Sequence, residues 1–215
     1  MLLAALQLFS AKGFADTSTR EIAQAAGTNV ASISYYFGDK AGLYRAVFKE
    51  PMGKPCDDIT RFLPEHLSLR QSLEGFIAGF LEPLKQGDLA QQLTRLHFRE
   101  MLEPTGLWAE QIDKHIRPVH EALAEVLRRH LGAQRSDDDV HRLAFSITGL
   151  AMQMFVTRDV IEGLRPALIA SNKALDLWAE RLADFAEAMV AVEAARRRGL
   201  HLNSAPAKPG KKAKA

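Results

Sequence analysis

The sequence predicts an all-α protein, because its composition, its prolines and the spacing of its apolar residues all favour helices. Ala, Leu, Glu, Arg and Gln are frequent, and the alternating runs of Val, Ile and Thr that would indicate strands are missing. The nine prolines leave long stretches without a helix breaker, at residues 1–50, 119–165 and 167–205. Apolar side chains in these stretches recur at intervals of three and four, the period of one helix face.

The chain has the composition of a folded protein of a reducing compartment. Its 215 residues can bury a core without disulfides, and its single cysteine, Cys56, can form neither an intramolecular disulfide nor a multi-cysteine zinc site. Charged residues interrupt every apolar run before it reaches the roughly 18 residues of a membrane span. We do not interpret the opening residues as a signal peptide. These features predict a cytoplasmic protein.

Composition divides the chain into two domains and a tail. Residues 51–64 concentrate Pro and Gly, so we expect them to join an N-terminal domain of short helices, residues 1–50, to a C-terminal domain of long helices, residues 51–203. Residues 204–215 are rich in Ala, Pro and Lys and predict a disordered tail. The tail carries four lysines and no acid, and without them the net charge of +2 becomes −2.

The N-terminal domain contains the start and stop signals of four short helices. Glycines end the first two helices, at Gly13 and Gly27. Side chains that can cap a helix precede the last three, at Ser18, Asn29 and Asp39. Ser18 also has Glu21 at the capping-box spacing. We expect the second and third helices over 19–26 and 30–36, and two short helices joined by such a turn have the outline of a helix-turn-helix.

Residues 3–48 resemble the DNA-binding domain of the tetracycline-repressor (TetR) family. The matching segments, in order, are ALQLFSAKGF at the end of the first helix, TREIAQAAG in the second, and YYF followed by a capped helix that contains Lys40 and Leu43. The resemblance implies a helix-turn-helix domain that binds operator DNA. It further implies a ligand-responsive transcriptional regulator, interpreted here as a repressor that a small-molecule effector releases from its operator.

Candidate DNA-binding residues lie on and beside the third helix. In a helix-turn-helix this helix enters the major groove, while flanking groups hold phosphates. The side chains with suitable chemistry for base edges are Thr28, Asn29, Ser32, Ser34 and Tyr35. The resemblance implies phosphate contacts by Tyr36 and Lys40, with a further contact from Thr17, Ser18 or Thr19. For each residue, the alternative is a helix cap or a solvated polar side chain.

Two features depart from the family pattern. The net charge of residues 1–50 is only +1, which predicts a weak electrostatic attraction to DNA. Met1 falls inside the first helix, where family members carry a basic arm and a further helical turn. Either the natural start lies upstream, or the first helix is shortened. The lysine-rich tail then either adds non-specific attraction for DNA or is only a solubilising segment.

The C-terminal domain is expected to contain five helices, over 69–85, 89–103, 107–131, 140–160 and 173–195. Pro118 interrupts the third of them and should bend it. The last helix has an apolar seam at alternating steps of three and four, formed by Leu175, Trp178, Leu182, Phe185, Met189 and Val192. In the TetR family the last two long helices pair with their copies, so the resemblance implies a homodimer through 140–160 and 173–195. The alternative is a purely internal core.

The segment LHFREMLEPTGLWAEQIDKHIRPVHEAL resembles the C-terminal domain of the CecR-like branch of the TetR family. A bend at Pro118 would leave room for a ligand pocket between helices. The candidate ligand-binding residues are Phe98, Met101, Trp108, Ile112, His115, Gln153 and Phe155. For the methionine and the aromatic residues the alternative is ordinary core packing.

No motif indicates an enzyme, a cofactor or a metal. His97 and Glu100 share a helix face, but the chain has no HExxH pattern and no glycine-rich phosphate loop. The aspartates at 137, 138 and 139 are best explained as a helix cap. We therefore expect no cofactor and no metal site. The alternative function is a helical sensor or interaction module whose N-terminal domain no longer binds DNA.

Overall fold

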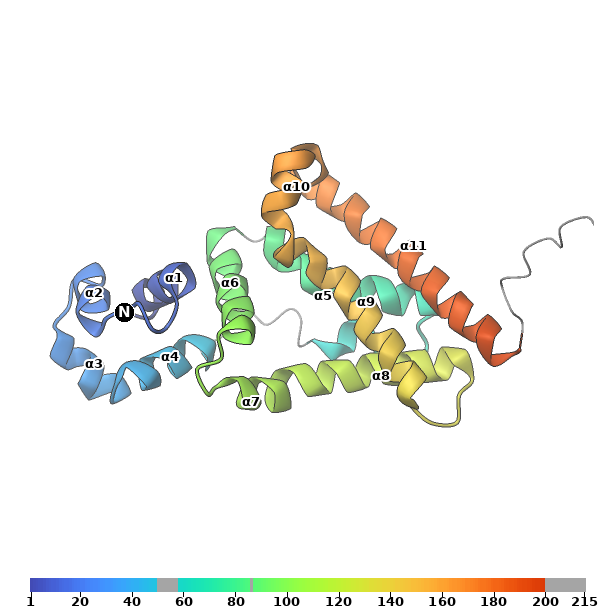
Figure 1. The fold of residues 1–215 in the computed structure, drawn as a ribbon, viewed down its shortest axis with the longest axis horizontal. Coiled ribbons are helices and arrows are strands. Elements are labelled where there is room, and N and C mark those ends of the chain that lie inside the picture. The colour runs from blue at the N-terminus through green and yellow to red at the C-terminus, as the bar shows by residue number, and fades with distance from the viewer. Residues whose placement is uncertain (50–57, 86, 200–215) are drawn as a thin grey trace, which may run out of the picture.

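The computed structural model describes residues 1–49, 58–85 and 87–199, and every regular element in these residues is a helix. The predicted all-α fold is confirmed. Four short helices form one end of the molecule, and the long helices α5, α8, α9 and α11 form the other, with α6 between them (Figure 1). The predicted lysine-rich tail and most of the predicted junction, residues 51–57, lie outside the described residues.

The four helices of the N-terminal domain are α1 (Leu2–Lys12), α2 (Thr19–Ala25), α3 (Val30–Phe37) and α4 (Lys40–Lys49). Their ends follow the capping signals of the sequence. Ser18 and Glu21 form both bonds of a capping box at α2, and the Asn29 side chain accepts a hydrogen bond from the Ala31 amide at 2.9 Å.

In the described part of the C-terminal domain, the first element is a short 3₁₀ turn, Ile59–Arg61, and the last is the longest helix. Its α-helices are α5 (Leu69–Lys85), α6 (Asp88–Leu102), α7 (Trp108–Gln111), α8 (Arg117–Leu131), α9 (Asp138–Val156), α10 (Arg158–Leu164) and α11 (Asn172–Arg197). A second 3₁₀ turn, Pro166–Leu168, connects α10 to α11.

Two of the predicted helices are divided in the structure. The helix expected over 107–131 consists of α7, a π-helical turn at Ile112–Ile116, and α8, in which Pro118 occupies the first turn. Proline is tolerated there because the first amides of a helix have no partner in the helix. The helix expected over 140–160 ends at Val156. The segment that connects it to the last helix contains an additional helix, α10.

The structure contains two hydrophobic clusters. The larger one joins α5, α8, α9 and α11, with Leu73, Leu123, Ile147 and Leu182 among its members. The smaller one is the core of the N-terminal domain, and it also includes three leucines from beyond that domain, which are Leu93, Leu96 and Leu107. Helix α6 therefore contributes two leucines to the N-terminal core.

The predicted seam of α11 faces two directions. Leu175 and Leu182 are buried in the subunit's own core, whereas Phe185 and Val192 are more than half exposed. Trp178 and Met189 are partly buried and also pack against that core. A 3.5-residue repeat drifts around a straight helix by about 20° per heptad, which turns Phe185 and Val192 outward. Only the exposed residues remain available to a second copy of the chain.

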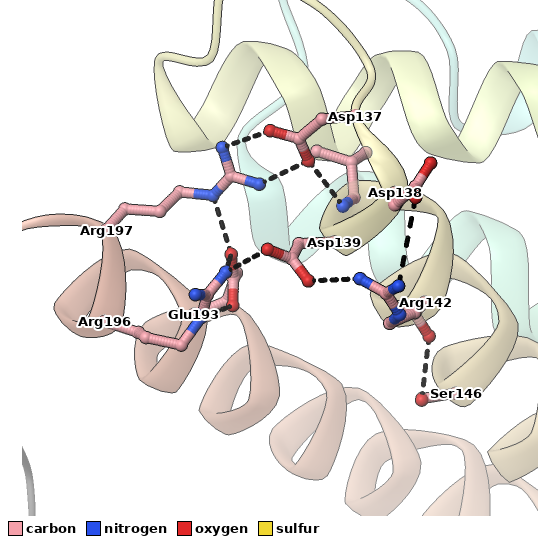
Figure 2. Close-up of polar contacts among 9 residues, drawn as sticks. Asp137, Asp138, Asp139, Arg142, Ser146, Glu193, Arg196 and Arg197 are labelled. Atoms are coloured by element: carbon pink, nitrogen blue, oxygen red, sulfur yellow. Dashed lines mark hydrogen bonds and ion pairs between the residues drawn. The ribbon is translucent and has the colours of Figure 1, made fainter.

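A polar network joins the start of α9 to the end of α11 (Figure 2). The Asp137 carboxylate caps α9 by accepting from the Val140 amide at 3.0 Å, as the aspartate run predicts. Arg197 donates to the same carboxylate, and Arg196 pairs with Asp139. This network fixes the two long helices at one end of their contact.

Candidate nucleic-acid interface

The turn between α2 and α3 holds the two helices of the motif in a fixed relation. Gly27 has φ = 63°, in the left-handed region that favours glycine, and the Thr28 amide bonds the Ala23 carbonyl oxygen at 2.9 Å. Ile22 of α2 and Ile33 of α3 are buried in the N-terminal core. With Ile33 turned inward, the opposite side of α3 faces solvent.

The outer surface of α3 presents two tyrosines. Tyr35 is 82% exposed and Tyr36 is 70% exposed, and their rings meet edge to face with centroids 4.9 Å apart. Ser34 is also exposed. A core would bury such large rings, so their exposure beside a free hydroxyl indicates a contact surface. Ser34, Tyr35 and Tyr36 are all candidate DNA-binding residues of the sequence analysis.

The other candidates on α3 already have partners within the motif. The Thr28 hydroxyl donates to the Ser32 hydroxyl at 3.3 Å, and Asn29 caps the helix. Thr28 and Ser32 are half-buried, while Asn29 is exposed. Asn29 therefore has an amide NH₂ group facing outward at the N-terminal end of α3, the end from which a recognition helix contacts bases.

Lys40 lies beside the turn that precedes α2. Its ammonium group donates to the Ala15 carbonyl oxygen at 3.2 Å and sits 4.5 Å from the centre of the Phe14 ring. An ammonium group has three donors, so two remain for a phosphate. The neighbouring Asp39 carboxylate accepts from the Gly42 amide at 2.6 Å, which places a negative charge at the start of α4 and leaves Lys40 as the group suited to an anion.

The three candidates before α2 differ in their surroundings. Thr17 is buried, and its hydroxyl donates to the Gly13 carbonyl oxygen at 2.7 Å, so its side chain holds the loop and does not face a phosphate. Ser18 is exposed but caps α2, and its hydroxyl lies 2.9 Å from the Glu21 carboxylate. Thr19 is half-buried. Burial excludes the Thr17 side chain from the surface that could contact DNA in this conformation.

Glu21 brings a fixed negative charge to the start of α2. The hydrogen bond from Lys12, together with those from Ser18, lowers the pKa of Glu21 to about 2. The carboxylate stays ionised at neutral pH and complements the helix dipole. The same turn also carries the Lys12–Glu21 ion pair and the exposed Arg20, next to the exposed Ser18.

The seven candidate ligand residues are all half-buried, and two of them pack against each other. The rings of Phe98 on α6 and Phe155 on α9 stack with centroids 5.1 Å apart. A hollow of about 220 Å³ lies beside α4 and α7, and among its lining residues only His115 is a predicted ligand residue. The structure thus brings Phe98 to Phe155 and leaves His115 in a separate hollow.

The histidines and carboxylates that could have indicated an enzyme have structural partners. Glu100 accepts a hydrogen bond from Tyr44 at 2.9 Å, and His97 contacts the Phe48 ring. A ring nitrogen of His120 lies 2.9 Å from a ring nitrogen of His141. Within residues 1–49, 58–85 and 87–199, no three metal-binding side chains come together. The Tyr44–Glu100 contact joins residues 56 positions apart, and no local pattern in the sequence indicates it.

A helix-turn-helix with an exposed reading surface, attached to a helical C-terminal domain, defines the class of helical DNA-binding regulators. The family described as "Bacterial regulatory proteins, tetR family" matches residues 1–47. The family described as "HTH-type transcriptional dual regulator CecR, C-terminal domain" matches residues 69–192, more than half of the chain. The chain therefore belongs to the TetR family of transcriptional regulators, which is not a family of enzymes, and its C-terminal domain is of the CecR type.

The sequence matches to two curated relatives extend over only part of each relative. The chain is 28% identical over 148 residues to "HTH-type transcriptional dual regulator CecR" of Shigella flexneri, covering 64% of this chain and 66% of that protein. It is 36% identical over 115 residues to "Probable HTH-type transcriptional regulator YttP" of Bacillus subtilis, covering 52% of this chain and 54% of the relative. The matches thus span between half and two thirds of these relatives.

Solved structures share the fold at low identity. A putative transcriptional regulator from Pseudomonas aeruginosa has a TM-score of 0.65 and 20% identity, covering 92% of this chain and 90% of that chain. The TetR family regulator PfmR from Thermus thermophilus has a TM-score of 0.61 and 18% identity, covering 86% of this chain and 95% of that chain. In the described part of the present chain, no helix has the length and apolarity needed to span a membrane.

Proposed function

We propose that this protein is a homodimeric repressor that binds operator DNA through α3 and leaves it when a small-molecule effector binds the C-terminal domain. The observation that carries the proposal is the exposed Tyr35–Tyr36 pair with Ser34 on the outer surface of α3. Asn29 and Lys40 lie at the two ends of this surface. Base edges are then read by the hydroxyl and amide groups of α3, and phosphates are held by Tyr36 and Lys40.

The homodimer is supported by apolar side chains that one subunit leaves in solvent. Large hydrophobic residues are exposed along α9, α10, α11 and the 3₁₀ turn that precedes α11. They are Phe145, Val156, Val160, Leu164, Leu168, Leu177, Phe185 and Val192. A soluble protein rarely leaves so many together without a partner. A second copy that covers this surface by two-fold symmetry also presents two α3 helices to successive turns of one DNA face.

The effector site is proposed at the α6–α9 contact and the adjoining α7. An apolar ligand that separates Phe98 from Phe155 would move α6, which packs into the core of the N-terminal domain. Met101, Trp108, Ile112 and Gln153 are proposed to complete the lining, whereas His115 lies in the separate hollow beside α4 and α7. Coupling requires only that the effector bind one placement of α6 more tightly than the other.

The direction of regulation follows the interpretation of the family resemblance. The Shigella flexneri relative is a dual regulator by name, and repression is the part of that behaviour proposed for this chain. Because operator DNA lies in the cytoplasm of a bacterium, the protein is proposed to work there. A promoter fusion in cells with and without the gene tests this direction, since repression predicts higher reporter output in the deletion strain.

Operator binding is tested by fluorescence anisotropy on duplexes that tile the DNA upstream of the protein's own gene, with scrambled duplexes as the reference. Tyr35→Ala should reduce the preference for the bound tile by about tenfold, the size of one good base contact. His66→Ala changes an exposed aromatic residue of the C-terminal domain and should leave binding unaltered. If the parent prefers none of the tiles to its scrambled form, the sensor-module alternative replaces the regulator.

A further inference from the structure

Glu100 is a fully buried carboxylate at the contact between the two domains. It lies on α6 with 0% of its surface exposed, and in the described part of the chain no other charged side chain is buried to this degree. Removing a carboxylate from water is costly unless hydrogen bonds replace the water. A charge retained in this position therefore depends on the groups that surround it.

Three donors from two other parts of the chain converge on this carboxylate. The Tyr44 hydroxyl of α4 donates to Oε2 at 2.9 Å, and the Thr105 amide donates to Oε1 at 2.9 Å. The Thr105 hydroxyl lies 3.1 Å from Oε1 and 3.0 Å from Oε2. One side chain thus joins α4, α6 and the loop from α6 to α7.

The surroundings of Tyr44 keep its hydroxyl protonated and directed at Glu100. Burial, and after it the hydrogen bond to Glu100, raises the pKa of Tyr44 far above its ordinary value. The phenol therefore keeps its proton at every physiological pH. Its ring is enclosed by Phe9, Phe14 and Phe48, each with its centroid about 5 Å away, so the hydroxyl has one direction available.

The other contacts of α6 with the N-terminal domain include apolar packing, an aromatic edge contact and the Arg99 side chain beside Gly13. Leu93 and Leu96 pack into the N-terminal core, and the rings of Phe48 and His97 meet edge to face with centroids 4.9 Å apart. Such contacts favour close packing but tolerate sliding by a fraction of a helical turn. Hydrogen bonds to a buried charge do not, because a displaced donor leaves the charge unsatisfied.

We propose that Glu100 is a positioning residue that fixes α4 on α6 and thereby sets the distance between the two α3 helices of the dimer. The proposal rests on the proposed function for its effect on DNA, but the Glu100 contact itself belongs to the free subunit. A shift of α6 against α4 breaks the Tyr44 bond, and a shift of the loop after α6 breaks the Thr105 bonds. The N-terminal domain then loses its one placement on the C-terminal domain.

The first arm of the experiment measures amide hydrogen exchange in the full-length protein without DNA. Tyr44→Phe removes only the donor hydroxyl, and it should speed the exchange of α4 amides about tenfold, the effect expected for one bond to a charged group. Amides of α5 and α11 should be unchanged. Glu100→Gln should also speed the exchange of α4 amides. Its side-chain amide replaces one accepting oxygen of the carboxylate with an NH₂ group, which donates.

The matched control is Thr94→Val on the same helix as Glu100. The Thr94 hydroxyl donates to the Ala90 carbonyl oxygen at 2.8 Å, a bond that stays within α6. Its loss should leave the exchange of α4 as in the parent. Unchanged α4 exchange in Tyr44→Phe would overturn the proposal, and so would an equal rise in every helix, which marks a general loss of stability.

The second arm measures affinity for operator duplexes whose half-sites are moved apart in steps of one base pair. The parent should prefer one spacing sharply, and Tyr44→Phe should flatten this preference about tenfold while its affinity for a single half-site is retained. A spacing profile as sharp as that of the parent would overturn the positioning role even if exchange rises. If the parent binds no operator at all, the proposed function fails, and the exchange arm alone decides whether Glu100 holds the two domains together.

Discussion

Arg197, in the last turn of α11, donates two hydrogen bonds to Asp137, the residue that caps α9, across 3.0 and 2.7 Å (Figure 2). The guanidinium, and after it the Val140 amide, lowers the pKa of Asp137 well below its ordinary value of 3.8. One carboxylate thus caps one helix and holds another. Residues 60 positions apart are joined by a pair that stays charged down to acidic pH.

The Asp137 carboxylate should stabilise the fold in a defined range of pH. Because its pKa is lowered on folding, its contribution is fully present above the ordinary value of 3.8 and is lost as the pH falls through the folded value. Asp137→Asn should therefore lower the urea midpoint at pH 7, and its difference from the parent should shrink below about pH 4. Urea titrations from pH 7 to about pH 2.5 measure this difference.

The matched control is Asp138→Asn in the same acidic run. The Asp138 side chain is 91% exposed, and its contact with Arg142 is long, at 3.9 Å. It should therefore contribute little to stability at any pH. Equal effects of the two substitutions at pH 7 would show that the Arg197 contact does not stabilise the start of α9.

Phe185 and Leu182 should respond in different ways to the same substitution. Phe185 is 55% exposed in one subunit and belongs to the surface proposed for the dimer, whereas Leu182 lies in the subunit's core. Phe185→Glu should convert dimers to folded monomers, because it places a charge in an apolar interface. Leu182→Glu should unfold the chain. Sedimentation analysis with circular dichroism separates the two results.

Lys173→Glu provides the control for that comparison, since it changes the charge of an exposed residue at the start of α11. It should remain dimeric. A dimer that survives Phe185→Glu with an unchanged dissociation constant would place the interface elsewhere, and a parent that is monomeric at micromolar concentration would remove it.

Gly42 should be irreplaceable by alanine in the N-terminal domain. A Cβ atom there would lie 1.9 Å from the Phe37 carbonyl oxygen, so α3 and α4 would have to separate. Gly42→Ala should lower the melting temperature and abolish operator binding. Gly163→Ala in α10 meets no atom within 4 Å and should be neutral or stabilising by up to about 1 kcal/mol. Indistinguishable melting curves for the two variants would contradict the placement of α4 on α3.

Local signals in the sequence were sufficient for the helix starts. Ser18, Asn29 and Asp137 cap the helices that their positions predict, because a cap depends on a side chain and an amide two or three residues away. The helix-turn-helix follows from the same short-range rules. The exposure of Tyr35 and the burial of Ile33 then follow from the helical period.

Contacts between distant segments could not be predicted in this way. Nothing near Glu100 in the sequence shows that Tyr44, 56 positions away, reaches it. The seam of α11 looked uniform because periodicity identifies apolar faces without saying which neighbour covers each one. Phe98 and Phe155 were predicted as ligand residues, and the structure adds that the two rings stack on each other.

Ser34 and Lys40 should separate base reading from phosphate binding. Ser34→Ala should reduce the preference for operator over scrambled duplex by about 1 kcal/mol, because its hydroxyl can distinguish base edges. Lys40→Gln should weaken both duplexes alike and reduce the slope of log affinity against log salt by roughly one. Anisotropy titrations at several salt concentrations measure both quantities. An unchanged salt slope in Lys40→Gln would leave Lys40 with only its contacts to Ala15 and Phe14.

The measurement that tests the central claim most directly is selection of binding sites from a random pool of duplexes by the purified parent protein. A dimer that reads DNA with two α3 helices should enrich an inverted repeat whose half-site centres are separated by about 10 base pairs or a multiple of that distance. Tyr35→Ala should enrich the repeat more weakly or lose it. A pool that remains random after repeated rounds with the parent would contradict the account, because the exposed surface of α3 would then read no DNA sequence.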